Sequence, residues 1–526
     1  MSKGIEVKIL RNSNIYTGNA RHPWARTLAI VDGSVAGLDT AADAWCDAPG
    51  AMMEDMEGAL VIPGLIDAHI HFMWYALSLR ELQLRGISRE SMVAQVAARV
   101  AEAPPGTWIS GRGWDQNIWE DSRFPCAADL DGAAPHHPVA LIAKNAHATV
   151  ANSAAMRAAG ITAETPDPPG GKLGRDSDGA PNGIFFENAT RLIKQAIPEP
   201  TLDEVVDAMD AAQCHLLAAG ITSIHDVDGN PAFAAVQELR RQGRQRVRVV
   251  KYVRLDVLEA VLEVGLRTGH GDDWLMFGGL KLFADGALGS RTGAMFAPYE
   301  GEPDNVGLLT LEPDRMQAIA HRAAKAGLAM AIHAIGDRAN RLVLDTLEAV
   351  KPHNPHLRHR VEHVQLITPA DQSRLARAGL VASMQPIHAI HDMAMADRYL
   401  GERTAHAYAW RSVQQAGAVL AFGSDSPIEV FDPFLGLYAA VTRCCEDGVP
   451  GPEGWHPEQR LTLAEALRAY TWGAAYAAGQ EARLGMLVPG YHADLLVLDR
   501  DIFSSPPQAL LETQVRRVMV GGDWVG

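Results

Sequence analysis

The chain has 526 residues, of which 47% are hydrophobic and 21% charged, so we expect a soluble globular protein built as a large barrel with additions or as several modules. A formal net charge of −16 without any basic block argues against nucleic-acid binding, and no apolar run is long enough to span a bilayer, which argues against a membrane role. The start, MSKGIEVKIL, lacks the apolar core of a signal peptide, and none of the five cysteines forms a C-x-x-C pair, so we expect a protein of the reducing cytoplasm.

Both ends of the chain predict short β-strands. Strands are expected at 7–10, 28–31 and 35–38 near the N-terminus, and at 493–498 and 515–520 near the C-terminus, with glycine turns between them. The two terminal segments, 1–60 and 480–526, could complete one β-sandwich, although their pattern alone does not establish that they pair.

The middle of the chain repeats a unit of helix, glycine and short apolar strand. Glycine suits the left-handed position just after a helix, and it precedes four of the strands. Strands that alternate with helices predict a parallel sheet, and eight of them predict an α/β fold with a closed (β/α)8 TIM barrel over 61–75 and 200–479. The expected strands lie within 62–72, 221–225, 246–254, 278–286, 328–333, 359–365, 380–385 and 418–425.

An inserted domain is expected between the first two barrel strands. About 150 residues separate them, far more than a βα unit needs, and turn residues are common in this stretch. An insertion at 76–199 follows a strand end, so we expect it to act as a lid over the carboxyl face of the barrel, where barrel enzymes hold their active sites.

Polar residues end several of the predicted barrel strands. His69 and His71 lie two apart on the first strand, so both imidazoles project to one side. Alone, an H-x-H pair is more often a chance or a core pair. Here Lys281, His333, His363 and Asp425 end four further strands, and such convergence on one opening predicts a site for a divalent metal.

Two of these residues have alternative interpretations. A lysine beside metals has to lose its charge, and neutral Lys281 could react with CO2 to form a metal-bridging carbamate; a side chain that snorkels or pairs with Asp285 fits the spacing equally well. Asp425 could cap a helix, or it could move a proton between a metal-activated water and a leaving amine.

Candidates for substrate contacts are less specific. His225 follows the second strand and His388 the seventh, and each is as easily structural. In the insertion, Trp114, Asn145 and His147 combine an aromatic ring with hydrogen-bonding groups, as a lid that touches substrate would. A packed tryptophan and a turn asparagine are the alternatives.

At this point the chain resembles the amidohydrolase superfamily, specifically amidohydrolase family 3, the group of YtcJ-like proteins and N-substituted formamide deformylases. The resemblance covers nearly the whole sequence, and KLFADGALGSRTG is its most specific motif. The matching segments are PGLIDAHIHF (63–72), GWDQ (113–116), GITSIHD (220–226), KLFADGALGSRTG (281–293), HAIGDRA (333–339), RVEHVQ (360–365), FGSDSP (422–427) and LGMLVPGYHADLLVLD (484–499).

The resemblance implies a role for each candidate ligand. His69 and His71 would hold one metal, His333 and His363 the other, and carboxylated Lys281 would bridge them, with two Zn²⁺ ions as the expected cofactors. Asp425 would ligate the first metal and shuttle protons. The resemblance also implies the barrel with a sandwich built from both termini, and it suggests a homodimer.

These observations predict a metal-dependent hydrolase that cuts a non-peptide C–N bond by metal-activated hydroxide. An N-substituted amide or formamide with an apolar group is the expected small-molecule substrate. A deaminase, a carbamate or cyclic amide hydrolase, a metal-dependent isomerase or decarboxylase, and a non-catalytic metal-binding regulator are the alternatives.

Overall fold

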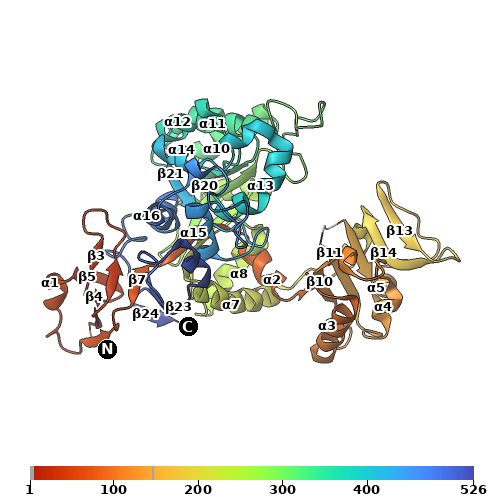
Figure 1. Ribbon diagram of the computed structural model, residues 1–526, viewed down its shortest axis with the longest axis horizontal. Coiled ribbons are helices and arrows are strands. Elements are labelled where there is room, and N and C mark those ends of the chain that lie inside the picture. The colour runs from red at the N-terminus through yellow and green to blue at the C-terminus, as the bar shows by residue number, and fades with distance from the viewer. Residues whose placement is uncertain (1–4, 145–146, 526) are drawn as a thin grey trace. The chain divides into compact units, whose positions relative to one another are not determined.

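The computed structural model describes residues 5–144 and 147–525. The chain divides into two compact units (Figure 1). The first joins Met1–Tyr75 to Met209–Gly526, and the second is Ala76–Ala208. The boundaries expected for the individual domains stay predictions.

The larger unit contains the predicted barrel. Its parallel sheet has eight strands, and they follow the order of the chain around the sheet. At the carboxyl ends of the first and last strands, the backbone N–H of Asp425 donates to the carbonyl of His69 at 2.7 Å, and that of His71 donates to the carbonyl of Ser426 at 2.9 Å. The predicted (β/α)8 fold is therefore confirmed. The strands are β8 (Leu65–Ile70), β15 (Ile221–Asp226), β16 (Arg248–Arg254), β17 (Leu275–Phe283), β18 (Met330–Ala334), β19 (Arg360–His363), β20 (Val381–Met384) and β21 (Val419–Phe422).

Helices connect these strands as the glycine pattern predicts. Gly220, Gly327, Gly379 and Gly417 all have positive φ, between 61° and 96°, which ends the preceding helix and turns the chain into a strand. The main helices are α7 (Leu202–Ala218), α8 (Asn230–Arg241), α10 (Pro313–Lys325), α11 (Asp337–Val350), α12 (Pro369–Arg377), α13 (Pro386–Leu400), α14 (Trp410–Gln415) and α15 (Pro433–Thr442).

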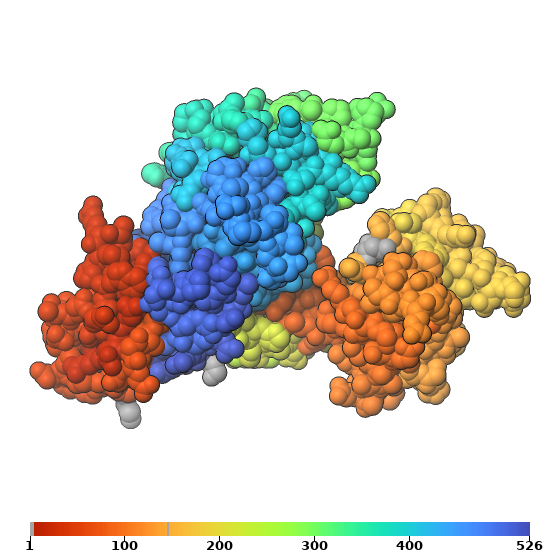
Figure 2. All heavy atoms as spheres, viewed as in Figure 1, coloured from red at the N-terminus to blue at the C-terminus, as the bar shows by residue number. Residues whose placement is uncertain are grey.

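Strands from both chain ends form two further sheets. In the larger one, β7 (Leu60–Pro63) pairs antiparallel with β22 (Leu495–Leu498), so that Ile62 lies opposite Leu496. Figure 2 shows the C-terminal residues beside the N-terminal ones. Apolar side chains of both sheets share one core. The larger sheet has the order β24 (Asp523–Val525), β23 (Val515–Val520), β22, β7, β2 (Asn14–Tyr16), β3 (Trp24–Ala25), and the smaller has β5 (Ser34–Leu38), β4 (Leu28–Val31), β1 (Val7–Arg11), β6 (Met52–Asp55).

The second unit, inserted after β8, has its own six-stranded sheet and core. Strands β10 and β11 pair in parallel, whereas β11, β12, β14 and β13 pair antiparallel. Helix α3 (Arg89–Glu102) buries Met92 and Val96 in the core. The sheet order is β13 (Gly171–Arg175), β14 (Pro181–Glu187), β12 (Ala148–Ala151), β11 (Val139–Ala143), β10 (Ile109–Trp114), β9 (Leu82–Gln83). Throughout 5–144 and 147–525, no helix combines the length and the apolar character needed to cross a membrane.

Candidate metal centre

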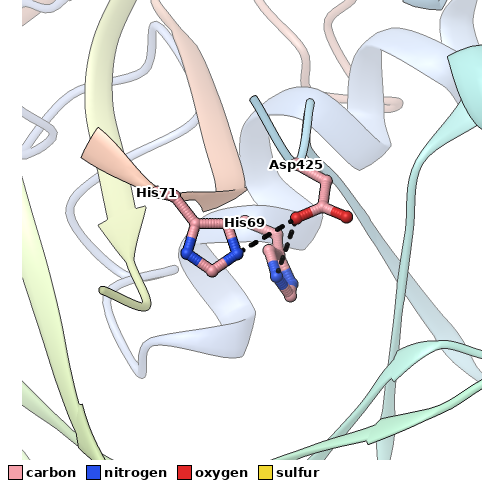
Figure 3. A group of neighbouring side chains, drawn as sticks. All are labelled: His69, His71 and Asp425. Carbon is pink, nitrogen blue, oxygen red and sulfur yellow. Dashed lines mark ion pairs between the residues drawn. The ribbon is translucent and has the colours of Figure 1, made fainter. Parts of the chain in front are cut away.

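His69, His71 and Asp425 meet at the carboxyl end of the barrel. Nε2 of His69 and Nε2 of His71 each lie 3.4 Å from Oδ1 of Asp425 (Figure 3). All three side chains are buried. Two imidazole nitrogens and a carboxylate oxygen so close together form a ligand group of the kind that zinc and related divalent metals prefer.

The second oxygen of Asp425 faces two more histidines. Nε2 of His388 lies 3.1 Å from Oδ2, and Nδ1 of His363 lies 4.0 Å from it. His388, expected to contact substrate, thus lies among atoms that could bind a metal. The carboxylate of Asp425 stands between two histidine groups and presents one oxygen to each.

Lys281 and His333 lie beside this centre. The Lys281 side chain is buried, and Nζ has no hydrogen-bond partner among the described residues. Burial lowers the pKa of Lys281 to about 8, which increases the fraction of neutral amine near neutral pH. The His333 ring centroid is 4.6 Å from that of His363, and Nε2 of His333 donates to the carbonyl of Gly286 at 2.9 Å. Nδ1 of His333 is then the nitrogen with a free lone pair.

Two candidate ligands have unusual backbone conformations. His363 has a φ of 72° and Asp425 a φ of 59°, in the left-handed region that residues other than glycine rarely adopt. Each such residue costs about 1–3 kcal/mol, and such residues cluster at functional sites. The fold therefore holds both side chains at the centre against a local preference.

A buried carboxylate contacts the Nδ1 atom of both His69 and His71. Glu362 contacts Nδ1 of His69, and Oδ1 of Asp228 lies 3.0 Å from Nδ1 of His71. When Nδ1 donates its proton to the carboxylate, the Nε2 lone pair of each imidazole stays free to bind a metal ion on the side of Asp425. These contacts set both the tautomer and the direction of the two rings.

Buried cations contact Glu362 and the backbone of Asp228. Arg360 pairs with Glu362 and donates to Ser383 Oγ at 2.8 Å. Burial alone would raise the pKa of Glu362, but Arg360 and His69 hold it well below its usual range. Nζ of Lys251 donates to the carbonyl of Asp228 at 2.8 Å and lies 3.0 Å from Oδ2 of Asp226.

Sequence patterns did not identify these supporting residues. The sequence signal that could have found them is a charged residue within an apolar strand. Such strands are RVEH, which contains Arg360 and Glu362, and RVVKYVR, which contains Lys251, and both are buried almost throughout. A charged residue in such a strand needs a partner inside the protein.

Trp114, His147 and His225, the other residues predicted to contact substrate, each contact a residue of their own unit. Trp114 is fully buried in the core of the insertion and its Nε1 donates to the carbonyl of Leu141 at 2.8 Å, so the packed alternative describes it better. His147 is exposed, with Nδ1 3.0 Å from Glu187. His225 is buried 2.8 Å from Arg360, an arrangement that supports the arginine. Asn145 lies outside the described residues.

Comparison with known proteins identifies the family. The amidohydrolase family model matches residues 53–525. Putative amidohydrolase YtcJ of Bacillus subtilis is 32% identical, with 89% of each chain covered. N-substituted formamide deformylase of Arthrobacter pascens is 30% identical, over 97% of this chain and 96% of that protein.

A solved structure of similar fold is also a metal-dependent hydrolase. An uncharacterized metal-dependent hydrolase from Pyrococcus furiosus has a TM-score of 0.80 and 30% identity, over 95% of this chain and 100% of its own. The resemblance inferred from the motifs is confirmed: the chain belongs to the amidohydrolase family of hydrolases.

Proposed function

We propose that this amidohydrolase cleaves the C–N bond of an N-substituted amide or formamide in a metal-dependent reaction. The observation that carries the proposal is the placement of the Asp425 carboxylate, with one oxygen 3.4 Å from two imidazole nitrogens and the other 3.1 Å from a third. Similarity over most of its length to a protein named N-substituted formamide deformylase supports this bond type.

The residues fit two divalent cations, with zinc as the proposed metal. His69 and His71 would hold one cation, and His333 and His363 the other. Lys281 supplies a buried Nζ without a protein partner. If the neutral amine of Lys281 formed a bond to the carbon of CO2 and released one proton, the resulting carbamate would supply two further oxygen ligands.

Asp425 is the group that moves protons in this scheme. When bound, the cations supply an activated water and polarise the substrate carbonyl. One carboxylate oxygen of Asp425 takes the proton of the attacking water and delivers it to the departing nitrogen, which leaves as an amine. The Nε2 of His388, 3.1 Å from Oδ2, holds the carboxylate in position.

The test measures metals and amine release together. Protein purified with zinc and bicarbonate is expected to contain about two metals per chain and to release amine from a panel of N-substituted formamides. Asp425→Asn should abolish release and retain most of the metal, whereas Asp304→Asn, a change at an exposed loop carboxylate, should behave as wild type. Normal turnover by Asp425→Asn would exclude the proposed proton transfer.

The homodimer and the cytoplasmic location stay predictions.

A further inference from the structure

Two neighbouring barrel strands end in exposed side chains next to the metal centre. Arg254 is the last residue of β16 and the one exposed residue of that strand. Its Cα is in register with that of Lys281 on β17, and β17 ends two residues later at Phe283. Both side chains therefore lie at the end of the barrel that carries the candidate ligands.

The Phe283 ring lies close to Arg254 and to two candidate ligands. The Arg254 guanidinium carbon is 5.9 Å from the ring centroid, and Lys281 Nζ is 5.0 Å from it. The His333 ring centroid is 5.3 Å away. With 36% of its surface exposed, Phe283 offers part of its ring to a ligand that reaches the centre.

Within residues 5–144 and 147–525, no carboxylate forms an ion pair with Arg254. None of the ion pairs among the described residues includes it, and the nearby Asp256 accepts instead from the amide of Asn230 at 2.9 Å. Arg248, at the other end of the same strand, pairs with Asp494 at 2.7 Å. An exposed guanidinium beside a catalytic opening, with its hydrogen-bond donors unused by carboxylates, suits an anion from solution.

Exposed apolar side chains follow two of the candidate ligands in the sequence. Trp74 follows His71, with ring centroids 5.7 Å apart and 37% of the tryptophan exposed. Ile428 and Val430 follow Asp425 and are 52% and 45% exposed. Exposed apolar surface of this kind marks ligand sites more often than ordinary protein surface.

We propose that Arg254 and Phe283 form a subsite for a substrate whose N-substituent carries a carboxylate on an apolar, preferably aromatic, group. The inference rests on the proposed function, and it adds the charge of the substrate. The guanidinium binds the carboxylate with two parallel hydrogen bonds, and the Phe283 ring packs against the apolar part. The amide bond is then directed towards Asp425.

A matched pair of substrates tests the subsite. N-Benzylformamide and 4-(formamidomethyl)benzoate differ by one carboxylate, and wild-type protein is expected to prefer the benzoate. In Arg254→Gln, the ratio of the two kcat/KM values should fall about 10- to 100-fold, mainly through KM, because a charge-assisted pair is lost. Arg254→Lys should retain part of the preference, and Arg377→Gln, at the end of α12, should retain all of it. An unchanged ratio in Arg254→Gln overturns the subsite.

Binding separates failure of the subsite from failure of the proposed function. If neither formamide is hydrolysed, the proposed function fails and the subsite is judged by calorimetry with 4-methylbenzoate and neutral 4-methylbenzyl alcohol. Wild-type holoenzyme should bind the benzoate more tightly, and Arg254→Gln should lose about 10- to 100-fold in benzoate affinity. Equal benzoate affinity in both proteins overturns the inference, because a carboxylate held by metal alone does not depend on Arg254.

Discussion

Oδ1 of Asp228 lies 3.0 Å from Nδ1 of His71 and fixes the direction in which that imidazole presents its other nitrogen. Asp228→Asn weakens this acceptor, so we expect a loss of about 10- to 100-fold in zinc affinity, the usual effect of removing such a partner. Competition with a zinc chelator measures the change. Asp304→Asn is the control, and equal zinc affinity in wild type and Asp228→Asn would show that the contact does not orient the ligand.

Lys281 leads to opposite expectations with and without metal. In metal-free protein the buried Nζ has no described partner, which is costly, so Lys281→Met should not lower the melting temperature. In zinc-loaded protein the same change removes the proposed bridge, so metal content and activity should fall. Thermal unfolding and elemental analysis of the metal-free and zinc-loaded forms check these expectations. In a second variant, Lys281→Ala, short carboxylic acids should restore part of the activity. A zinc-loaded variant that keeps both metals would exclude the bridging carbamate.

The ion pair between Arg248 and Asp494 joins the barrel to the C-terminal strands. Both side chains are almost fully buried, and Asp494 also accepts from the N–H of Gly521 at 2.7 Å. Arg248→Met leaves a buried carboxylate without its counter-charge, which costs about 3–5 kcal/mol. We expect a clear fall in the urea midpoint, and partial recovery when Asp494→Leu is added. An unchanged midpoint in Arg248→Met would mean that water reaches the carboxylate.

The link between α11 and α12 should depend on pH. Asp371 contacts Nε of Arg341 at 2.7 Å and Thr368 Oγ1 at 2.9 Å. Burial would raise the pKa of Asp371, but these partners and Arg374 hold it below its ordinary value of 3.8. A lowered folded pKa stabilises the protein above the unfolded pKa, and this stabilisation is lost as the pH falls through the folded value.

Asp371→Asn should therefore unfold at a lower temperature than wild type at pH 7, and the difference should shrink below about pH 4. Melting curves across this range measure it. A difference that stays constant down to pH 3 would show that the carboxylate charge contributes nothing to this link.

The barrel and the position of its ligands were predictable because they depend on local patterns. Glycine after four of the helices marks the start of the next strand, and alternation along the chain at the end of β8 places His69 and His71 on one side. Each candidate ligand could then be assigned to a strand end without knowledge of any contact. Pairing of the chain ends needed the structure, because the register of Ile62 with Leu496 joins residues far apart in sequence.

Contacts made across the barrel were not predictable. Glu362 contacts His69 from another strand, and Asp228 reaches His71 from the loop after β15. Such pairs depend on how side chains from different strands are oriented towards each other. The sequence periodicity of a single strand does not give this orientation. Trp114 shows the same limit, because an aromatic residue between turns can pack inwards as readily as it can face a ligand.

The pairing of β7 with β22 has a consequence for biosynthesis. Only Gly64 separates β7 from β8, the strand that carries His69, whereas β22 lies more than 400 residues later. During translation, the edge of β7 that pairs with β22 has no partner strand until β22 has been synthesised. A nascent chain lacking its final segment keeps this apolar edge available to chaperones or to other chains. The sheet next to the metal-binding strand can therefore close only after β22 has been synthesised.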